Sequence, residues 1–393
     1  MDKEKIRLLS KKYEPEAIRD RHWLHQHPEL SNQEFETTEY ICHMLDEIGV
    51  PWERPTPTGV IATIQGEGGS GRTLGLRGDI DALPIQELTD LPYKSIHDGV
   101  MHACGHDSHA VNLLTTARML MEMRQELKGT VKLIFQPAEE YFPSGARQML
   151  DSGKLDDVDA FVGIHEMSAL PTGRLAVQNG AIFAASCTIR ITVHGKGGHG
   201  GMPQTAVDAT LAAAAVLVNL QSFVSRELAP YKPLVVTIGT FHSGTERNII
   251  SEKAEMMGTI RYYDPDEAQH FQEALRRIAE HTAMAHNASA DVEFIPGLES
   301  IINDPSLVSM GQQTAEELFG TEALATVPQN PGCDDFCYYG EHKPAMYVIV
   351  GSANKELGTD YPHHNPHFNV DDKAVLQAAE FFTAFALQYC GEE

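Results

Sequence analysis

The chain has 393 residues, of which 55 are acidic and 30 basic, giving a formal net charge of -25. Its length predicts two domains of ordinary size. The acidic excess argues against nucleic acid or an anionic membrane as a partner, because both would repel the surface. The charged amino terminus has no apolar signal core, and no apolar run approaches the roughly 20 residues of a membrane span. Six scattered cysteines do not form a disulfide framework. We therefore expect a cytoplasmic protein with reduced thiols.

Helices come first in the chain, followed by two strands. Apolar residues recur at helical spacing over residues 14–26 and again over 35–48, where Phe35 is among the residues expected to face inward. Two short apolar runs, 59–66 and 73–81, are separated by a glycine-rich turn. This pattern predicts a pair of neighbouring strands.

The second of these runs ends in two carboxylates, Asp79 and Asp81. In an open α/β sheet, ligands bind at the carboxyl ends of the strands. A solvated strand end or a helix cap would place the same residues there. Both interpretations stay open for Asp79.

Residues of metal-binding type then cluster in MHACGHDSHA, residues 101–110. Cys104 and His106 are two residues apart, and Gly105 lets the backbone turn both inward. Thiolate and neutral imidazole bind borderline divalent ions such as zinc, cobalt, nickel and manganese. A buried free cysteine beside an ordinary histidine would give the same pattern, so the pair needs support from elsewhere in the chain. A long helix follows, whose apolar spacing indicates packing.

The run VKLIF is uniformly apolar, which predicts a central strand of a largely parallel sheet. Glu139 and Glu140 follow it. Adjacent carboxylates raise each other's pKa, so a pair at the ligand-facing edge of a sheet suits a cation or shared proton work. An exposed acidic pair is nonetheless common on protein surfaces.

Two further apolar runs lead to histidines: residues 160–166 include His165 near their end, and residues 344–351 are followed by a loop that contains His363, His364 and His367. The carboxyl ends of parallel strands meet at one edge of a sheet. We therefore expect these histidines, the carboxylates and the Cys104 loop to converge on a site for a divalent transition metal.

The chain changes character between about residues 185 and 297, where the expected elements follow the order β-α-β-β-α-β. This order is typical of a four-stranded antiparallel sheet with two helices on one face. We expect an α/β protein in which residues 1–184 and 298–393 form a mostly parallel sheet flanked by helices. Residues 185–297 form an inserted ferredoxin-like α+β domain. Its edge strand can pair with a second copy, which predicts a homodimer.

Motifs along nearly the whole chain resemble the M20 metallopeptidase superfamily, and within it the amidohydrolase subfamily of aminoacylase, hippurate hydrolase and auxin-conjugate hydrolase type. In the family's order, the motifs are HQHPELSNQEFET, RGDIDALPI, MHACGHDSH, FQPAEE, GIH, GKGGHGGMP, RNIISEKAEMMGTIR, DDFCYY and HHNPHFNVDD. Each alone would be unremarkable, but so many in order are not expected by chance.

The resemblance implies two divalent metal ions per subunit, of zinc, manganese, cobalt or nickel. The implied metal ligands are Cys104, His106, Glu140, His165 and His364. The other implied site residues are Glu139 as general base, Asp81 as support for the ligands, His199 as a residue that serves the partner subunit's active site, and Asn248 and Arg261 as contacts of the substrate carboxylate.

By this resemblance the reaction is hydrolysis of the amide bond of an N-acyl amino acid or a similar small conjugate, by a metal-activated water that Glu139 deprotonates. One alternative is a dipeptidase or carboxypeptidase of the same superfamily. Another is a catalytically silent, metal-dependent binding protein, which would be expected to lack the base. The segment EMSALP after His165, Gln204 and Cys333–Asp335 depart from the family's pattern. These departures lie near the expected substrate pocket and leave the identity of the substrate open.

Overall fold

The computed structural model describes residues 2–392, which form two compact units. The first comprises the chain up to Ile182, Ile302–Pro328 and the chain from Asp334 onward, and the second comprises Phe183–Ile301 and Gln329–Cys333. From the sequence, boundaries are expected after residues 184 and 297, and the grouping of residues 329–333 with the second unit is not expected.

A seven-stranded sheet in the order β1-β2-β4-β3-β5-β15-β6 forms the centre of the first unit. Its strands are β1 (Trp52–Glu53), β2 (Val60–Gln65), β3 (Thr73–Asp79), β4 (Thr130–Gln136), β5 (Ala160–Pro171), β6 (Leu175–Ala176) and β15 (Ala345–Ala353). The inner strands β4, β3, β5 and β15 run parallel to one another, whereas β1, β2 and β6 pair antiparallel with their neighbours. The predicted mainly parallel α/β fold is confirmed.

The expectation that residues 59–66 and 73–81 form neighbouring strands is wrong. β4 lies between β2 and β3, antiparallel to the first and parallel to the second. The buried residues of β4 reflect its central position, where an apolar strand loses the most contact with water. The glycine-rich turn therefore connects β2 and β3 without pairing them.

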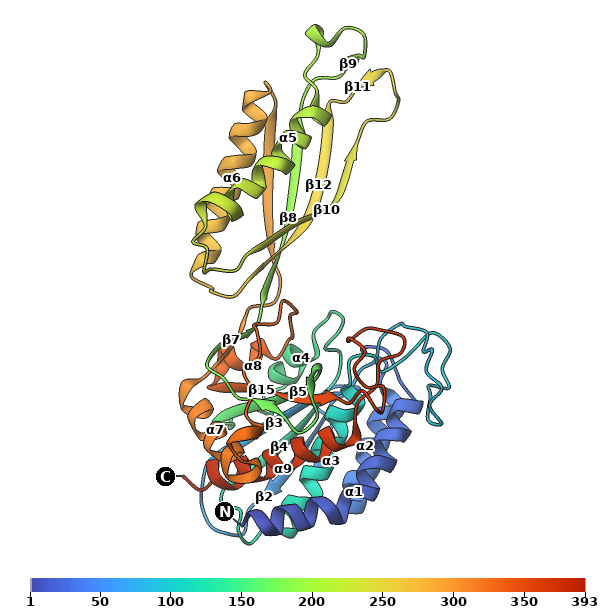
Figure 1. Ribbon diagram of the computed structural model, residues 1–393, viewed down its shortest axis with the longest axis vertical. Helices are drawn as coiled ribbons and strands as arrows, with labels where there is room; N and C mark the ends of the chain where they lie inside the picture. Colours follow the sequence, from blue (N-terminus) through green and yellow to red (C-terminus); the bar gives the residue numbers. More distant parts are fainter. Residues whose placement is uncertain (1, 393) are drawn as a thin grey trace. The chain divides into compact units, whose positions relative to one another are not determined.

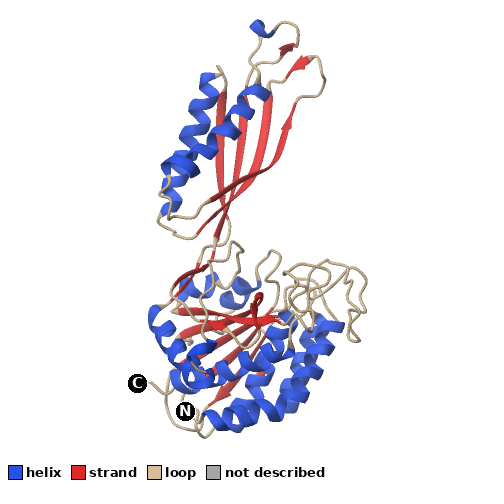
Figure 2. Cartoon of the chain, viewed as in Figure 1, coloured by secondary structure: helices blue, strands red, loops and turns tan. Residues whose placement is uncertain are grey.

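Helices flank this sheet (Figures 1 and 2). They are α1 (Lys3–Gln26), α2 (Phe35–Ile48), α3 (His106–Glu122), α4 (Gly145–Asp151), α7 (Pro305–Phe319), α8 (Cys337–His342) and α9 (Asp372–Tyr389). α3 contacts β3, β4 and β5, is covered in turn by α1, α2 and α9, and is buried from His106 to Leu120. The start of α3, where the expected metal ligands lie, is therefore held on all sides by packing.

The first helices differ from expectation in two details. α1 begins at Lys3 rather than near residue 14, because Asp2 accepts a hydrogen bond from the backbone N–H of Lys5 and caps the helix. Pro15 consequently lies inside α1. Phe35 was expected to face inward, but it is 55% exposed because it lies in the first turn of α2, ahead of the residues that this helix buries.

The second unit is a four-stranded antiparallel sheet in the order β10-β12-β8-β13, with two helices on one face (Figure 1). Its main elements are β8 (Ala185–His194), α5 (Ala209–Ser222), β10 (Val235–Ser243), β12 (Lys253–Tyr262), α6 (Glu267–Ala285) and β13 (Ser289–Pro296). Buried and exposed residues alternate along β8 and β12, because the helices cover only one face. The predicted inserted α+β fold is confirmed.

One helical stretch, Ala209–Glu227, has the length and mean hydropathy, 1.2, of a membrane-crossing helix. This stretch differs from the expectation that no apolar run approaches the length of a membrane span. Its buried side chains, including Val216 and Leu220, belong to the core of the second unit. The core helix of a folded domain has the same length and composition, so these properties alone do not identify a membrane-crossing helix.

Candidate metal centre

The Cys104 loop turns sharply into α3 at Gly105, whose φ is +87°. Glycine adopts this left-handed conformation at little cost. An added Cβ would also lie only 2.2 Å from Oε1 of Glu166. Glycine is therefore required here both by the turn and by the Glu166 carboxylate that packs against it.

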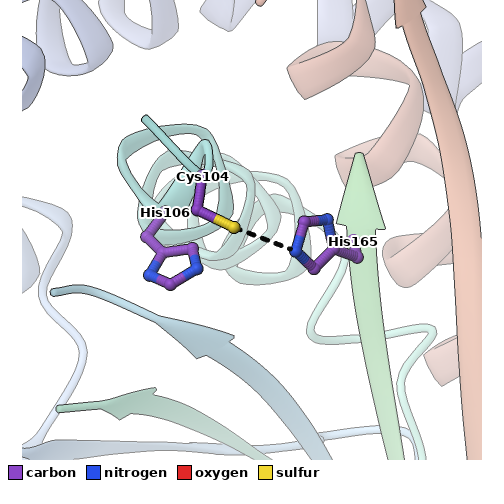
Figure 3. Close-up of side chains that lie close together, drawn as sticks. All are labelled: Cys104, His106 and His165. Atoms are coloured by element: carbon purple, nitrogen blue, oxygen red, sulfur yellow. Dashed lines mark hydrogen bonds between the residues drawn. The ribbon is translucent and has the colours of Figure 1, made fainter. Parts of the chain in front are cut away.

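Cys104, His106 and His165 form a group whose ligand atoms lie within 4.8 Å of one another. Figure 3 shows the sulfur of Cys104 pointing toward the ring of His165, with 3.6 Å between Sγ and Nε2. Nδ1 of His165 is 2.6 Å from the carbonyl oxygen of Glu166 and donates to it. Burial lowers the pKa of His165 to about 4, so its ring is neutral and Nε2 carries a lone pair that can bind a metal.

Cys104 also belongs to a second group, with Glu140 and His364. Oε1 of Glu140 lies 3.3 Å from Nε2 of His364. His364 has a φ of +64°, which is uncommon for a residue other than glycine. Its backbone N–H donates to the carbonyl oxygen of Ala103 at 2.8 Å, which joins the histidine loop to the Cys104 loop.

Two buried atoms of these groups, Nε2 of His106 and Oε1 of Glu140, have no hydrogen-bond partner among the described residues. Leaving a buried polar atom unpaired costs about 1–3 kcal/mol. A cation held by each of the two groups would remove that cost. Because thiolate, imidazole and carboxylate together suit a divalent transition ion, the residues present fit a metal.

Asp81 orients His106 and the segment that carries Glu140. One of its carboxylate oxygens lies 3.1 Å from Nδ1 of His106, and the other accepts from the Ser31 hydroxyl at 2.6 Å and the Glu140 backbone N–H at 3.0 Å. Burial alone would raise the pKa of Asp81, but its interactions with His106 and Ser31 outweigh burial and lower it. The ionised carboxylate thus holds Nδ1 of His106 and turns Nε2 toward the ligand group.

Glu139 lies in the loop after β4, and its carboxylate groups with Glu140 and His106. Burial, together with the negative charges of Asp334 and Glu140, raises the pKa of Glu139 well above its usual value. A carboxylate with high proton affinity beside metal ligands has the properties of a general base.

A chain of alternating basic and acidic side chains, unexpected from the sequence, runs beside these ligands through Arg77, Asp79, His109, Glu166 and His363. Arg77 donates to Asp79 at 2.6 Å, and the His109 ring hydrogen-bonds to Asp79 through Nδ1 and to Glu166 through Nε2. The other oxygen of Glu166 lies 3.0 Å from Nε2 of His363. Asp79 is therefore a buried ion-pair partner rather than a solvated strand end or a helix cap.

His109 lies close enough to Asp79, His106 and His165 to resemble a ligand. Burial alone would lower the pKa of His109, but the carboxylates of Asp79 and Glu166 raise it to about 9. Both ring nitrogens are engaged by carboxylates, which leaves neither for a metal. The spacing of three residues from His106, one helical turn, was the signal in the sequence that this residue faces the same site.

The three remaining predicted residues lie in the second unit. β9 (Gly198–His199) pairs with β11 (Ile249–Ile250), and the carbonyl oxygen of Asn248 accepts from Gly200 at 2.8 Å, so the structure brings His199 and Asn248 together. Nδ1 of the exposed His199 accepts from the backbone N–H of Gly201 at 3.0 Å. A neutral His199 ring therefore carries its proton on Nε2 and can donate it.

Arg261 lies apart from His199 and Asn248 within this unit. It is the next-to-last residue of β12. The first residue of β12, Lys253, comes three positions after the end of β11. Arg261 is eight positions after Lys253 in the strand, roughly 25 Å at the usual rise per residue.

The chain is similar along most of its length to proteins of one family. Residues 75–388 match the family described as peptidase family M20/M25/M40. The chain is 40% identical to N-acetylcysteine deacetylase of Bacillus subtilis (strain 168), over 97% of this chain and 98% of that protein. It is 39% identical to N-acyl-L-amino acid amidohydrolase of Geobacillus stearothermophilus, over 77% and 82%, and 34% identical to thermostable carboxypeptidase 2 of Saccharolobus solfataricus, over 98% of each.

A solved structure of similar fold is that of the Bacillus subtilis YXEP protein, described as a dinuclear metal binding peptidase from the M20 family. Its TM-score is 0.86 at 36% identity, over 97% of this chain and 99% of that one. The fold and the sequence matches together define a hydrolase. The chain belongs to peptidase family M20/M25/M40, which confirms the resemblance of its motifs. Two of these relatives are named as a deacetylase and an amidohydrolase, and one is named as a carboxypeptidase.

Proposed function

We propose that the protein is a metal-dependent enzyme that hydrolyses the amide bond of N-acyl amino acids or similar small conjugates. The observation that carries this proposal is the pair of ligand groups that share Cys104, with Glu139 beside them. Two ions of zinc, manganese, cobalt or nickel suit these groups by ligand type. The names of the deacetylase and amidohydrolase relatives support the substrate class, and the dinuclear neighbour supports two ions.

When bound, the divalent ions would polarise the scissile carbonyl and lower the pKa of a water in the site. Glu139 takes a proton from the attacking water and gives it to the leaving amine. The high proton affinity that burial, Asp334 and Glu140 confer on Glu139 favours the first transfer. Asp81 keeps His106 fixed throughout, so the ligands need not reorganise during the reaction.

We propose that His199 donates a hydrogen bond to the oxyanion. We propose that Asn248 and Arg261 contact the substrate carboxylate. Roughly 25 Å of strand separates Arg261 from the end of β12 near His199 and Asn248, too far for one small substrate to touch all three in one subunit. We therefore place His199 and Asn248 in the active site of the partner subunit, within a homodimer.

A surface for this dimer is available on the second unit. β10 is an edge strand, and α5 exposes the apolar side chains of Leu211 and Val218, which are 57% and 66% exposed. Edge strands and exposed apolar residues favour pairing about a two-fold axis. The cytoplasm stays the proposed location, in keeping with the thiols of Cys42, Cys104, Cys187 and Cys390, which form no disulfide.

A dipeptidase or carboxypeptidase activity is the second candidate, supported by the carboxypeptidase relative. The two activities differ at the amino side of the scissile bond, where a dipeptidase must bind a free ammonium group. A catalytically silent binding protein is disfavoured, because such a protein has no use for Glu139 among the ligands.

A matched substrate panel separates these candidates. One amino acid is offered as its N-acetyl derivative, as the carboxyl-terminal residue of a free dipeptide, and as the same residue in an amino-blocked dipeptide, each with manganese, cobalt or zinc. We expect the highest kcat/KM for the N-acetyl derivative, with Glu139→Gln protein as the background control. A higher kcat/KM for the free dipeptide would favour the dipeptidase, and no turnover of any substrate by metal-loaded protein would favour the binding protein.

A further inference from the structure

The carboxylate of Glu166 has no role in the reaction described above, although it follows the ligand His165 directly. It is 3% exposed and both of its oxygens are engaged. Oε2 accepts from Nε2 of His109, and Oε1 accepts from Nε2 of His363 at 3.0 Å. Because both oxygens accept from ring nitrogens, Glu166 is not available as a metal ligand.

These contacts connect three of the segments that carry the ligands. His109 lies in α3, one turn after His106, and His363 lies in the loop that carries His364. Glu166 itself lies in β5 beside His165. One buried carboxylate therefore joins the helix, the strand and the histidine loop.

His364 is the ligand with the least support of its own. Its side chain is 53% exposed, so packing does not fix it, and its backbone has a positive φ. On one side its loop is held by the hydrogen bond to the carbonyl oxygen of Ala103. On the other it is held by His363, whose ring packs on Phe368 with 4.9 Å between centroids and is fixed by Glu166.

We propose that Glu166 is a positioning residue that acts through His363: it holds His364 in place and so sets the affinity of the ion bound by Cys104, Glu140 and His364. This inference rests on the proposed two-ion site. Partners of this kind behind the ligands typically contribute about 10–100-fold to metal affinity.

Cobalt binding to metal-free protein tests the proposal without relying on activity. Wild type, Glu166→Gln and the control Glu356→Gln are titrated with cobalt. Calorimetry measures the number of ions bound and the affinity of each, and absorption follows the cobalt–thiolate band. Glu356 is exposed and lies in the same β15–α9 connection. We expect two equivalents in wild type and in Glu356→Gln. In Glu166→Gln, one equivalent should weaken about 10–100-fold while the thiolate band persists, because Cys104, His106 and His165 are unchanged.

His363→Gln removes the other member of the contact at a position 24% exposed, and keeps the test informative if Glu166→Gln fails to fold. It should weaken the same equivalent by a similar factor. The double variant should lose no more affinity than the weaker-binding single variant, because both changes break one connection.

Two tight equivalents in Glu166→Gln and His363→Gln, matching Glu356→Gln, would overturn the inference. Equal weakening of both equivalents, or losses that multiply in the double variant, would also overturn it, because neither fits an effect on His364 through His363. If wild type itself binds no divalent ion, the proposed two-ion site is wrong. By contrast, if wild type and Glu166→Gln both bind two ions tightly, the two-ion site stands and only the role of Glu166 is wrong.

Discussion

Neighbouring residues decide what each carboxylate of the site can do. Glu139 and Glu140 are adjacent and chemically identical, yet their surroundings differ. Oε1 of Glu140 lies 3.3 Å from Nε2 of His364 and makes no hydrogen bond among the described residues. Glu139 instead has its pKa raised by burial and by the charges of Asp334 and Glu140. Two carboxylates whose environments differ in this way can divide the work, one as ligand and one as base.

Glu139→Gln tests this division. The amide keeps the volume of the side chain but cannot take a proton from water, so we expect metal content to be retained and kcat to fall by about two to four orders of magnitude. Elemental analysis and steady-state kinetics on the same preparation measure both quantities. Near-normal kcat would mean that another group is the base.

The types of the site residues could be predicted from the sequence, but most of their partners could not. Glu140 and His165 stand at or near the ends of apolar runs, Cys104 stands in a cluster of ligand-type residues, and the structure places Cys104 within reach of both. Glu166 gave no such signal, because its partners His109 and His363 are 57 and 197 residues away in the chain. Contacts this distant depend on the packing of the whole unit.

Among the elements, the loop after β4 shows how a neighbouring helix holds the catalytic segment. Glu34, immediately before α2, is buried, and its Oε1 accepts from the backbone N–H of Ala138 at 2.8 Å and of Asn32 at 2.9 Å. Ala138 has a φ of +48°, and Glu139 follows it directly. The conformation of this loop therefore depends on Glu34 as well as on its own sequence.

Glu34→Gln should change how stability depends on pH. Burial raises the pKa of Glu34 to about 7 from 4.5, so the folded protein holds this proton more tightly than the unfolded chain does. The stability it contributes is complete below pH 4.5 and is lost as the pH rises toward 7. Between about pH 5 and 7.5, wild type should lose about 2 kcal/mol more unfolding free energy than the variant, whose amide does not titrate.

Chemical denaturation at both pH values measures this difference. Glu36→Gln, at an exposed position in the first turn of α2, is the matched control and should follow wild type. Parallel pH dependence of Glu34→Gln and wild type would show that Glu34 titrates normally.

The types of the elements were more predictable than their pairing. The helical pattern identified α2, α7 and α9, whereas β2 and β3 were expected to be neighbours because a short turn joins them. Helical periodicity is a local property of the chain. Strand order depends instead on which strand buries the most apolar surface in the centre of the sheet. Here β4 lies beside β2, and its Thr130 pairs with Gln65, 65 residues earlier in the chain.

At the scale of the whole molecule, the proposed function draws three substrate contacts from the second unit. His199 lies in β9, which pairs with β11, and Asn248 directly precedes β11. Arg261 lies roughly 25 Å along the sheet. This spacing is the physical reason to expect an active site built from two subunits.

Subunit mixing tests that expectation. His199→Ala should keep its metal and lose about 100–1,000-fold in kcat, as expected for an oxyanion donor. In a heterodimer of His199→Ala and Glu139→Gln subunits, one active site carries both defects and the other carries neither. Mixing the two nearly inactive proteins should therefore restore activity. If subunit exchange is demonstrated and activity stays lost, His199 does not act on the partner subunit.

Titration of activity with metal tests metal-dependent amide hydrolysis most directly. Protein stripped with a chelator is assayed on an N-acyl amino acid while zinc, manganese or cobalt is added and the ions bound per chain are counted. We expect no turnover without metal, and recovery that reaches its plateau at about two bound ions per chain. Full turnover by protein in which elemental analysis detects no divalent ion would contradict the proposed function.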